Sequence, residues 1–189
     1  MSLAEISITT VTDQSVEPPF QRILVPVDGS ELSDEAVDQA VRLAATTGAT
    51  LVFLTVVEPF LALTVSSEML ETTKAEYERA AERRAGNILL AAAAKADEAR
   101  VPRAILRAQS GAPHEAIIET ATERCCDLIA MASHGRKGFS ALVLGSVTNR
   151  VLTHSAIPVL VLRKPPETVE RIETPAARGD AMCAGAGIA

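Results

Sequence analysis

Five short apolar runs, separated by longer amphipathic stretches, predict strands that alternate with helices along this chain. The predicted strands are Arg22–Asp28, Leu51–Val57, Arg103–Ala108, Leu128–Met131 and Val159–Leu162. The second run is nearly continuous in apolar residues and rich in β-branched side chains, as expected of a parallel strand covered on both faces. The repeated order of strand and helix predicts an α/β protein with an open, mainly parallel five-stranded sheet and helices on both faces.

The stretch between the first two predicted strands has helical periodicity and recognisable ends. Ala36, Ala40 and Ala44 recur at helical spacing in this stretch. Ser30 or Ser33 is a candidate N-cap, and Gly48 is the expected stop. The beginning of the ordered chain therefore predicts a β-α-β unit.

A longer helix is predicted from Glu68 onward, with a face of mostly small apolar residues and a charged, solvated face. The apolar face is predicted to hold Tyr77, Ala81, Ala85, Ile88, Ala92, Ala96 and Ala99. The segment Glu58–Ser67 before it has three interpretations: an irregular flap near a binding site, part of the core, or part of a subunit contact. Pro113 is a favourable first residue for the next helix.

The stretch from Asp127 to Leu162 combines a buried strand, a glycine-punctuated loop and the start of a helix. Gly135 and Gly145 leave backbone amides accessible to a ligand, because a glycine has no Cβ to clash with it. Ser146 is a candidate cap for a helix whose first amides attract an anion. The pattern therefore indicates a phosphate site, although neither the G-x-G-x-x-G fingerprint nor a P-loop occurs in the chain.

Spacing makes this glycine signal more specific. Ser133-His134-Gly135, nine further residues and then Gly145-Ser146-Val147-Thr148 resemble the nucleotide loop of the universal stress protein family. The ATP-binding branch of that family has Gly, two residues, Gly, nine residues, Gly and then Ser or Thr. Ala132 replaces the first glycine here. The segments VPVDGS, DLIAMASHG and LGSVTNRVL together carry the resemblance, which covers about residues 21–163.

The resemblance implies a Rossmann-like fold of the adenine nucleotide α-hydrolase type, with strand order 3-2-1-4-5. In such a sheet, ligands bind beyond the carboxyl ends of the strands at the topological switch point. That point would lie between the first and fourth strands. Asp28 and Ser133, about a hundred residues apart in sequence, would then meet at one cleft.

The resemblance also implies a ligand, ATP with or without Mg²⁺, and the residues that hold it. Adenine would lie near Val27 and Val56, the ribose near Asp28 and Ala132, and the phosphates on the amides of Gly135 and of Gly145 to Thr148. The full set is Pro26, Val27, Asp28, Val56, Met131, Ala132, His134, Gly135, Gly145, Ser146, Val147 and Thr148. From the residues alone, Asp28 is interpreted as a turn residue. His134 is either a loop-ordering hydrogen-bond partner, a phosphate contact or a base.

Composition limits the classes of function. The net charge of −6 and the 3% of aromatic residues argue against a nucleic-acid binder with a basic face and stacking rings. A bound polyanion would need a local basic pocket, for which the candidates are His134, Arg136, Lys137 and Arg150. No apolar run is long enough to span a bilayer, so no membrane insertion is expected. The three cysteines form no disulfide or metal pattern and fit a reducing, cytoplasmic location.

The length of 189 residues favours one domain, expected over residues 21–163 between flexible tails of residues 1–20 and 164–189. No motif indicates a catalytic nucleophile or metal set. The resemblance implies a cytoplasmic ATP-binding regulatory or stress-response protein rather than an enzyme, with slow ATP hydrolysis left open. The alternative is a nucleotide-independent dimeric module of the same fold, which Ala132 favours. A related α-hydrolase enzyme is a third reading, against which the lack of an SGGxDS loop speaks.

A homodimer is expected in both main readings. The last predicted strand would be an apolar sheet edge that needs cover, with Val159, Leu160 and Val161 exposed to a partner. The resemblance implies that this strand pairs with its counterpart in a second subunit.

Overall fold

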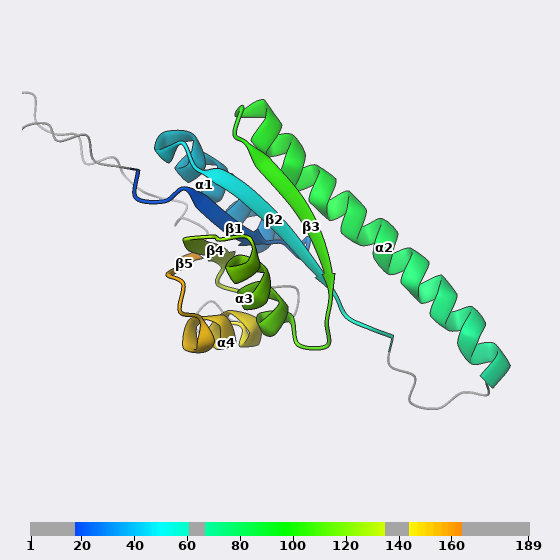
Figure 1. Cartoon of the computed structure of the whole chain (residues 1–189). Helices are drawn as coiled ribbons and strands as arrows, with labels where there is room; N and C mark the ends of the chain where they lie inside the picture. The colour runs from blue at the N-terminus through cyan, green and yellow to red at the C-terminus, as the bar shows by residue number, and fades with distance from the viewer. Residues whose placement is uncertain (1–17, 61–66, 135–143, 164–189) are drawn as a thin grey trace, which may run out of the picture.

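The structure is a computed structural model of the whole chain and describes residues 18–60, 67–134 and 144–163, with the first seven residues of its longest helix described by backbone alone. Five strands and four helices alternate along these residues (Figure 1). The strands are β1 (Arg22–Pro26), β2 (Thr50–Val57), β3 (Arg103–Gln109), β4 (Leu128–Ala132) and β5 (Val159–Leu162). The helices are α1 (Glu31–Thr47), α2 (Ser67–Glu98), α3 (Pro113–Glu123) and α4 (Ser146–His154).

All strand pairs are parallel, and the sheet has the order β3-β2-β1-β4-β5. This arrangement confirms the fold class and the strand order predicted from the sequence. β1 and β4 are neighbours although they are far apart in the chain. The switch point therefore lies between them, at the carboxyl ends of both strands.

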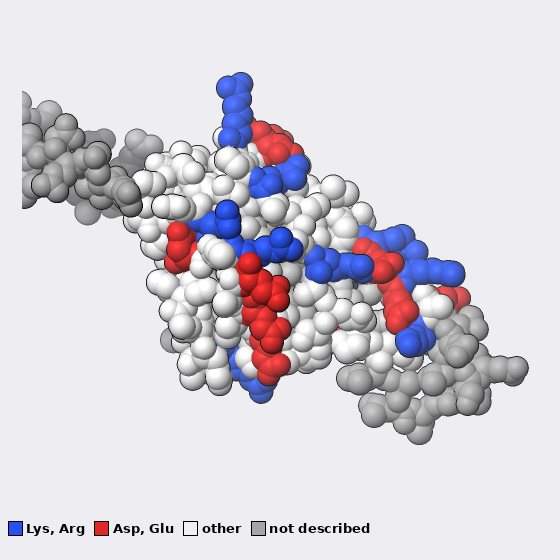
Figure 2. Space-filling model, in the orientation of Figure 1, with Lys and Arg blue, Asp and Glu red and all other residues white. Residues whose placement is uncertain are grey.

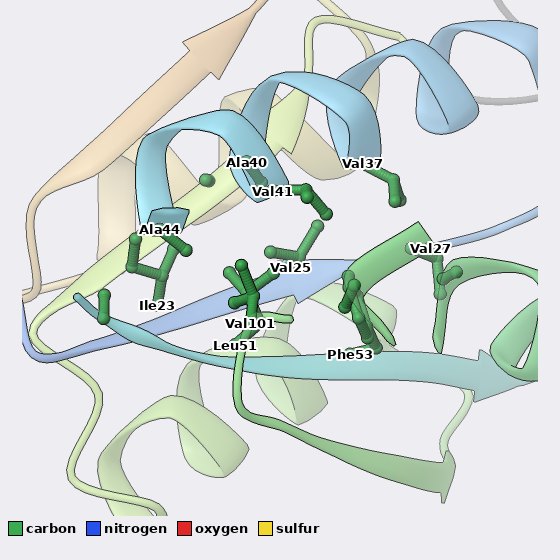
Figure 3. Packing of buried hydrophobic residues seen from close by; sticks show 14 of the residues in the cluster. Ile23, Val25, Val27, Val37, Ala40, Val41, Ala44, Leu51, Phe53 and Val101 are labelled. Atoms are coloured by element: carbon green, nitrogen blue, oxygen red, sulfur yellow. The ribbon is translucent and has the colours of Figure 1, made fainter. Parts of the chain in front are cut away.

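Side chains of alternate strand residues fill two separate cores, one on each face of the sheet. On one face, Ile23, Val25 and Phe53 pack beneath α1 and α2, and Figure 3 shows α1 residues such as Val37 lying against them. On the other face, Leu24 and Leu54 pack with the residues of α3 and α4. Every residue of β4 is buried, because helices cover both of its faces.

The predicted ends of α1 are confirmed in detail, and the strand before it ends earlier than predicted. The Ser30 hydroxyl accepts a hydrogen bond from the Ser33 amide, so Ser30 is the N-cap. Gly48 ends the helix in the left-handed conformation, with a φ of 73°. β1 ends at Pro26 rather than at Asp28. The reason for this early end lies in the site described below.

The predicted apolar face of α2 is partly wrong. Tyr77 is 40% exposed, whereas Leu89 and Ala93, which the prediction omitted, are buried. The helix is longer than the strands that it covers, so its first half runs beyond the sheet, as Figure 1 shows. There the Tyr77 ring contacts the Phe60 ring at 5.4 Å between centroids. Helical periodicity alone cannot reveal where a helix leaves the core.

One ion-pair cluster joins α2 to the first turns of α1. Lys95 Nζ lies 2.7 Å from Asp34 Oδ1 and 2.9 Å from Asp38 Oδ1. Partial burial disfavours the charged amine, but the hydrogen bonds to both carboxylates outweigh this effect, so the Lys95 pKa is raised. A raised lysine pKa contributes stability at neutral pH, which is lost as pH rises past the ordinary value of 10.5 toward the raised one.

The adjacent cysteines differ in exposure. Cys126 is buried in the core beside α3, whereas Cys125 is exposed. Burial raises the pKa of the Cys126 thiol to about 11, which makes it a poor nucleophile at neutral pH. The expectation that at least one of the pair serves as a small buried hydrophobe is confirmed.

Several predictions concern residues outside those that the structure describes. They are the tails (1–17 and 164–189), residues 61–66 of the segment with three interpretations, Cys183, and Gly135, Arg136 and Lys137 in the nucleotide-type loop. Among the described helices, none is long and apolar enough to cross a membrane.

Gly29 provides a test of how α2 fixes the loop after β1. Its φ is 77°, and an added Cβ would lie 2.8 Å from Ile88 Cδ1 of α2. Gly48 has a similar φ of 73° with nothing within 4 Å of an added Cβ. We therefore expect Gly48→Ala to cost about 1 kcal/mol from the backbone alone, and Gly29→Ala to cost about 1–3 kcal/mol more. Urea unfolding measures both, and equal costs would contradict the close packing of Gly29 against α2.

Candidate functional site

The sheet opens between β1 and β4 before either strand ends. β1 pairs with β2 as far as Pro26 and Leu54, and β4 pairs with β5 as far as Ala132 and Leu162. Between β1 and β4, however, the register stops at Leu24 and Ile129. The last residues of the two strands are therefore not paired with one another at the switch point, and we call this break in the β1–β4 ladder the crevice.

Pro26 explains why the two strands part. In a parallel sheet the backbone groups of successive residues point to opposite neighbours. The Val27 amide donates to the Leu54 carbonyl of β2 at 2.8 Å, so the backbone of Pro26 is directed toward β4. Proline has no N–H and cannot make the next hydrogen bond of that ladder. The sequence thus places a ladder break at the position where a ligand could enter.

Three side chains organise the loop between β1 and α1. The Asp28 carboxylate accepts the Ser30 amide at 3.0 Å, and the Asp28 amide donates to the Ser33 hydroxyl at 3.2 Å. These bonds, with the Ser30 cap, fix the turn that carries Asp28 beside the crevice. Asp28 therefore acts as the turn residue expected from the sequence, and its carboxylate is half-buried at the carboxyl end of β1.

Two hydrogen bonds hold the start of α4 against the end of β4. The Gly145 amide donates to the Ser133 carbonyl at 2.9 Å, and the Thr148 hydroxyl donates to the Ala132 carbonyl at 3.0 Å. Both ends of the loop that contains residues 135–143 are thereby joined. The carbonyl of Ala132 lies on the side of β4 that faces β1, where the two strands are no longer paired. There it accepts its hydrogen bond from the buried Thr148 hydroxyl.

The prediction that Ser146 caps α4 is wrong by one position. Gly145 occupies the N-cap, Ser146 is the first helical residue, and among the described residues no side chain caps this helix. The Gly145 amide is already bonded to Ser133, so the amides of the next three residues, Ser146 to Thr148, are those that an anion can reach. Sequence patterns place helix ends only to within a residue or two, because caps are decided by local geometry.

His134 follows β4 and is only 6% exposed. Its Nδ1 lies 3.1 Å from the Ser133 hydroxyl. Its Nε2 is buried and has no hydrogen-bond partner within the part of the chain that the structure describes. One ring nitrogen thus orders the start of the loop, and the other is a buried polar atom that an added donor or acceptor would satisfy.

Val56 lies two residues beyond the last backbone hydrogen bond between β1 and β2. Because backbone direction alternates along a parallel strand, the N–H and C=O of Val56 face the β1 side, as those of Leu54 do. β1 has ended at this level. The N–H donor and the C=O acceptor of Val56 therefore both face the crevice.

Sequence reasoning missed Thr55 as a site residue. Its hydroxyl donates to the Val27 carbonyl at 3.0 Å, and the side chain is 5% exposed. The sequence did contain an indication of this role, since Thr55 is the one polar side chain in the predicted buried strand LVFLTVV. A buried hydroxyl in such a strand needs a specific acceptor.

The structure brings most of the predicted residues to one place. The predicted residues of β1 and β4 lie on neighbouring strands, and Val56 lies on β2, on the other side of β1. The predicted residues of α4 are joined to β4 by hydrogen bonds. The side chains of Val27, Met131, Ala132 and Thr148 are buried, so these residues can offer a ligand mainly backbone groups. Among the basic candidates, Arg150 is exposed on α4. No group of three or more metal-ligating side chains occurs among the described residues.

A second hollow, of about 430 Å³, lies between α1 and α2 and is lined by residues such as Gly29, Asn87 and Ile88. No residue of β4 or α4 lines it. Val27, directly after β1, also lines it, so the hollow adjoins the crevice on the α1 and α2 side of the sheet, and no unsatisfied buried group of the described residues points to a ligand there.

Comparison with known proteins finds relatives of this chain along most of its length. The chain is 31% identical to universal stress protein MJ0531 of Methanocaldococcus jannaschii over 77% of its length and 84% of that protein. It is 33% identical to universal stress protein YxiE of Bacillus subtilis over 76% of its length and 99% of that protein.

Solved structures give the same result. Hypothetical protein MJ0577 superimposes with a TM-score of 0.65 at 26% identity, covering 77% of this chain and 98% of that one. A universal stress protein in complex with cAMP superimposes with a TM-score of 0.58 at 28% identity, covering 77% and 98%. A sequence model of the Universal stress protein family matches residues 19–163. The chain therefore belongs to the universal stress protein family.

Proposed function

We propose that this protein binds an adenine nucleotide, with ATP as the ligand, in the crevice between β1 and β4, and acts as a cytoplasmic regulatory or stress-response protein. The observation that carries the proposal is the break in the β1–β4 ladder at Pro26. Beyond the end of β1, the backbone groups of Val56 on β2 face this break, and α4 begins after the end of β4 on its other side. The similar protein bound to cAMP supports an adenylate as the ligand class.

The base would lie at the β2 side of the crevice. The N–H and C=O of Val56 face this side as a neighbouring donor and acceptor. Adenine presents an acceptor nitrogen beside an exocyclic amine donor, which complements this pair. Half-buried Pro26 would contact the ring, and Val27, whose side chain is buried beneath α1 and α2, would offer backbone groups. Met131 is buried in the core on the opposite face of the sheet.

The sugar and phosphates would extend toward α4. Asp28, two residues after β1, and the backbone of Ala132, at the end of β4, would contact the ribose. The amides of Ser146, Val147 and Thr148 would bind phosphate oxygens, supported by the helix dipole. The exposed Ser146 hydroxyl adds a donor. We propose that Gly135 contributes from the other end of the loop.

Two further groups fit this proposal. The buried Nε2 of His134 would gain a partner from the ligand or from the loop ordered by it. Mg²⁺, if bound with ATP, would be held chiefly by phosphate oxygens and water, as is usual for this ion. We propose binding rather than catalysis. The Ser133 hydroxyl and His134 Nδ1 lie 3.1 Å apart, but both side chains are buried and no described residue orients the ring through Nε2.

The test is the nucleotide content of the purified full-length protein, measured by acid release and chromatography, followed by ATP titration of nucleotide-free protein. We expect a co-purified adenylate or saturable ATP binding. Neither co-purified nucleotide nor titratable binding would overturn the proposal. It would instead leave the second candidate function, a nucleotide-independent dimeric module, which the methyl group of Ala132 at the ribose position favours.

We also propose a homodimer through β5. The sheet has two outer strands, and they differ in charge. β3 carries Arg103 and Arg107, which pair with Asp97 and Glu82 of α2 at 2.6 and 2.8 Å. Two copies of β3 paired antiparallel about Ile105 would place each Arg103 opposite an Arg107, and like charges opposite one another are unfavourable. Figure 2 shows such basic and acidic side chains interspersed on one face of the molecule.

β5 has no such protection. Its four residues are uncharged and apolar, and none of the four is buried, with Leu160 37% exposed. An exposed apolar edge strand of this kind is a template for pairing with another chain. The edge strand without charges is therefore the one that a second subunit would cover.

Charges introduced into β5 should dissociate this dimer. We expect the double variant V159K/V161K to be monomeric by light scattering, because lysines at a strand edge oppose pairing. Ile105→Lys, which adds a charge to the other outer strand, should leave the mass of the wild type unchanged. A dimeric double variant, or a monomeric wild type, would count against β5 as the interface.

A further inference from the structure

The Val27 carbonyl has an unusual hydrogen-bond partner. It accepts the Thr55 hydroxyl at 3.0 Å, while the Val27 amide makes an ordinary ladder bond to Leu54 at 2.8 Å. Thr55 is buried, and its side chain lies on the α1 and α2 side of β2, as the alternation with Leu54 and Val56 requires. The hydroxyl thus reaches across to the neighbouring strand at the point where β1 ends.

In a continued parallel ladder this carbonyl would have a different donor. After the bond from the Val27 amide to the Leu54 carbonyl, the next bond would run from the Val56 amide to the Val27 carbonyl. Among the described residues, the backbone bond from Val27 to Leu54 is present and the bond from the Val56 amide to the Val27 carbonyl is absent. The Thr55 hydroxyl has taken the place of the Val56 amide.

We infer that Thr55 is a positioning residue for base recognition, and this inference rests on the proposed function. By holding the Val27 carbonyl toward the α1 and α2 side of β2, its hydroxyl keeps the Val56 N–H out of the β1–β2 ladder. The N–H and C=O of Val56 then remain directed into the crevice as an adjacent donor and acceptor. Thr55 acts through Val27 and Val56 and does not itself touch the ligand.

The chemistry of the base makes this a specificity device. Adenine offers a ring acceptor beside an amine donor, which pairs with an N–H and a C=O. Guanine offers a ring donor beside a carbonyl acceptor, which places donor against donor and acceptor against acceptor. Unpaired polar groups in a closed site are strongly rejected. A Val56 amide that is bonded to Val27 would recognise neither base, so discrimination depends on the hydroxyl of Thr55.

Binding measurements test the inference. Thr55→Val keeps the β-branched shape but removes the donor, and Thr55→Ser keeps the hydroxyl. We expect Thr55→Val to weaken ATP binding by roughly tenfold and to narrow the preference for ATP over GTP, with Thr55→Ser close to the wild type. Thr50→Val, at the other end of β2, is the matched control and should change neither value.

Amide hydrogen exchange of the nucleotide-free protein provides a readout that does not depend on binding. In the wild type, the Val56 amide should exchange at least about tenfold faster than the Leu54 amide, which lies within the ladder. In Thr55→Val, the Val27 carbonyl becomes available, and the Val56 amide should be protected as Leu54 is. Equal protection of the two amides in the wild type would overturn the inference.

The outcomes separate the inference from the proposed function. Wild-type binding of ATP with equal affinity and selectivity in Thr55→Val would overturn the inference and leave the proposed function standing. A wild type that binds no adenylate would overturn both. Loss of ATP binding in Thr55→Ser as well as in Thr55→Val would show that packing rather than the hydroxyl is responsible, and would also contradict the inference.

Discussion

Gly145→Val should abolish most of the ATP affinity, with a loss of roughly tenfold to a hundredfold. The new side chain would stand at the N-cap of α4, where phosphates approach the amides of Ser146 and Val147. Each charge-assisted bond to a phosphate is worth about 1.5–3 kcal/mol, so displacing the phosphates by a small distance is costly. Isothermal titration of ATP into nucleotide-free protein measures the loss.

The variant should nevertheless fold. Gly145 has a φ of −59° and a ψ of 151°, which any residue adopts, so valine adds no backbone strain. Gly111→Val is the matched control, because Gly111 follows β3 at the same carboxyl end of the sheet and, among the described residues, an added Cβ meets only Pro59 Cγ at 4.0 Å. We expect the control to bind ATP as the wild type does. Undiminished binding by Gly145→Val would show that the phosphates lie elsewhere.

Phe53→Ala should lower the free energy of unfolding by about 3–5 kcal/mol. Phe53 is the largest fully buried side chain, with 0% exposure, and lies in β2 among residues of both α1 and α2 (Figure 3). Its removal would leave a cavity beneath both helices, which the tightly packed sheet cannot close. Urea denaturation followed by circular dichroism measures the change.

Ile105→Ala is the control for this prediction. Ile105 is paired in register with Phe53 on the neighbouring strand but is 39% exposed. Because most of the cost of such a substitution comes from burial, we expect a loss of about 1 kcal/mol or less. Equal losses for the two variants would contradict the placement of the core under α1 and α2 rather than at the β3 edge.

Local pattern was sufficient for much of the fold. The run LVFLTVV, Ser30 before α1, Gly48 after it and Pro113 at the start of α3 each act through short-range chemistry: side-chain size, a hydroxyl acceptor, or a restricted or permissive φ. These effects depend on near neighbours in the chain, and the predicted elements were accordingly found close to their predicted bounds.

The errors have a common origin in tertiary contacts. Tyr77 has the right spacing for the apolar face of α2, but the sheet ends before reaching it, so it is exposed. Leu89 and Ala93 are buried because of where α2 crosses the sheet. The cap of α4 moved to Gly145 because the Ser133 carbonyl holds its amide, a contact across the loop.

The sequence by itself determined the alternation of strands and helices, the glycine-punctuated loop after β4 and the family resemblance, since all three are patterns of residue type and spacing. Only the tertiary structure decided where the pairing of β1 with β4 stops and which hydroxyl donates a hydrogen bond to the Val27 carbonyl. The missing N–H of Pro26 has an effect only once β4 lies beside it. The hydroxyl of Thr55 likewise has a role only because β1 ends before a backbone bond forms between Val27 and Val56. The Val27 carbonyl then accepts the Thr55 hydroxyl instead. Contacts between distant segments created both features, so no local pattern could predict them.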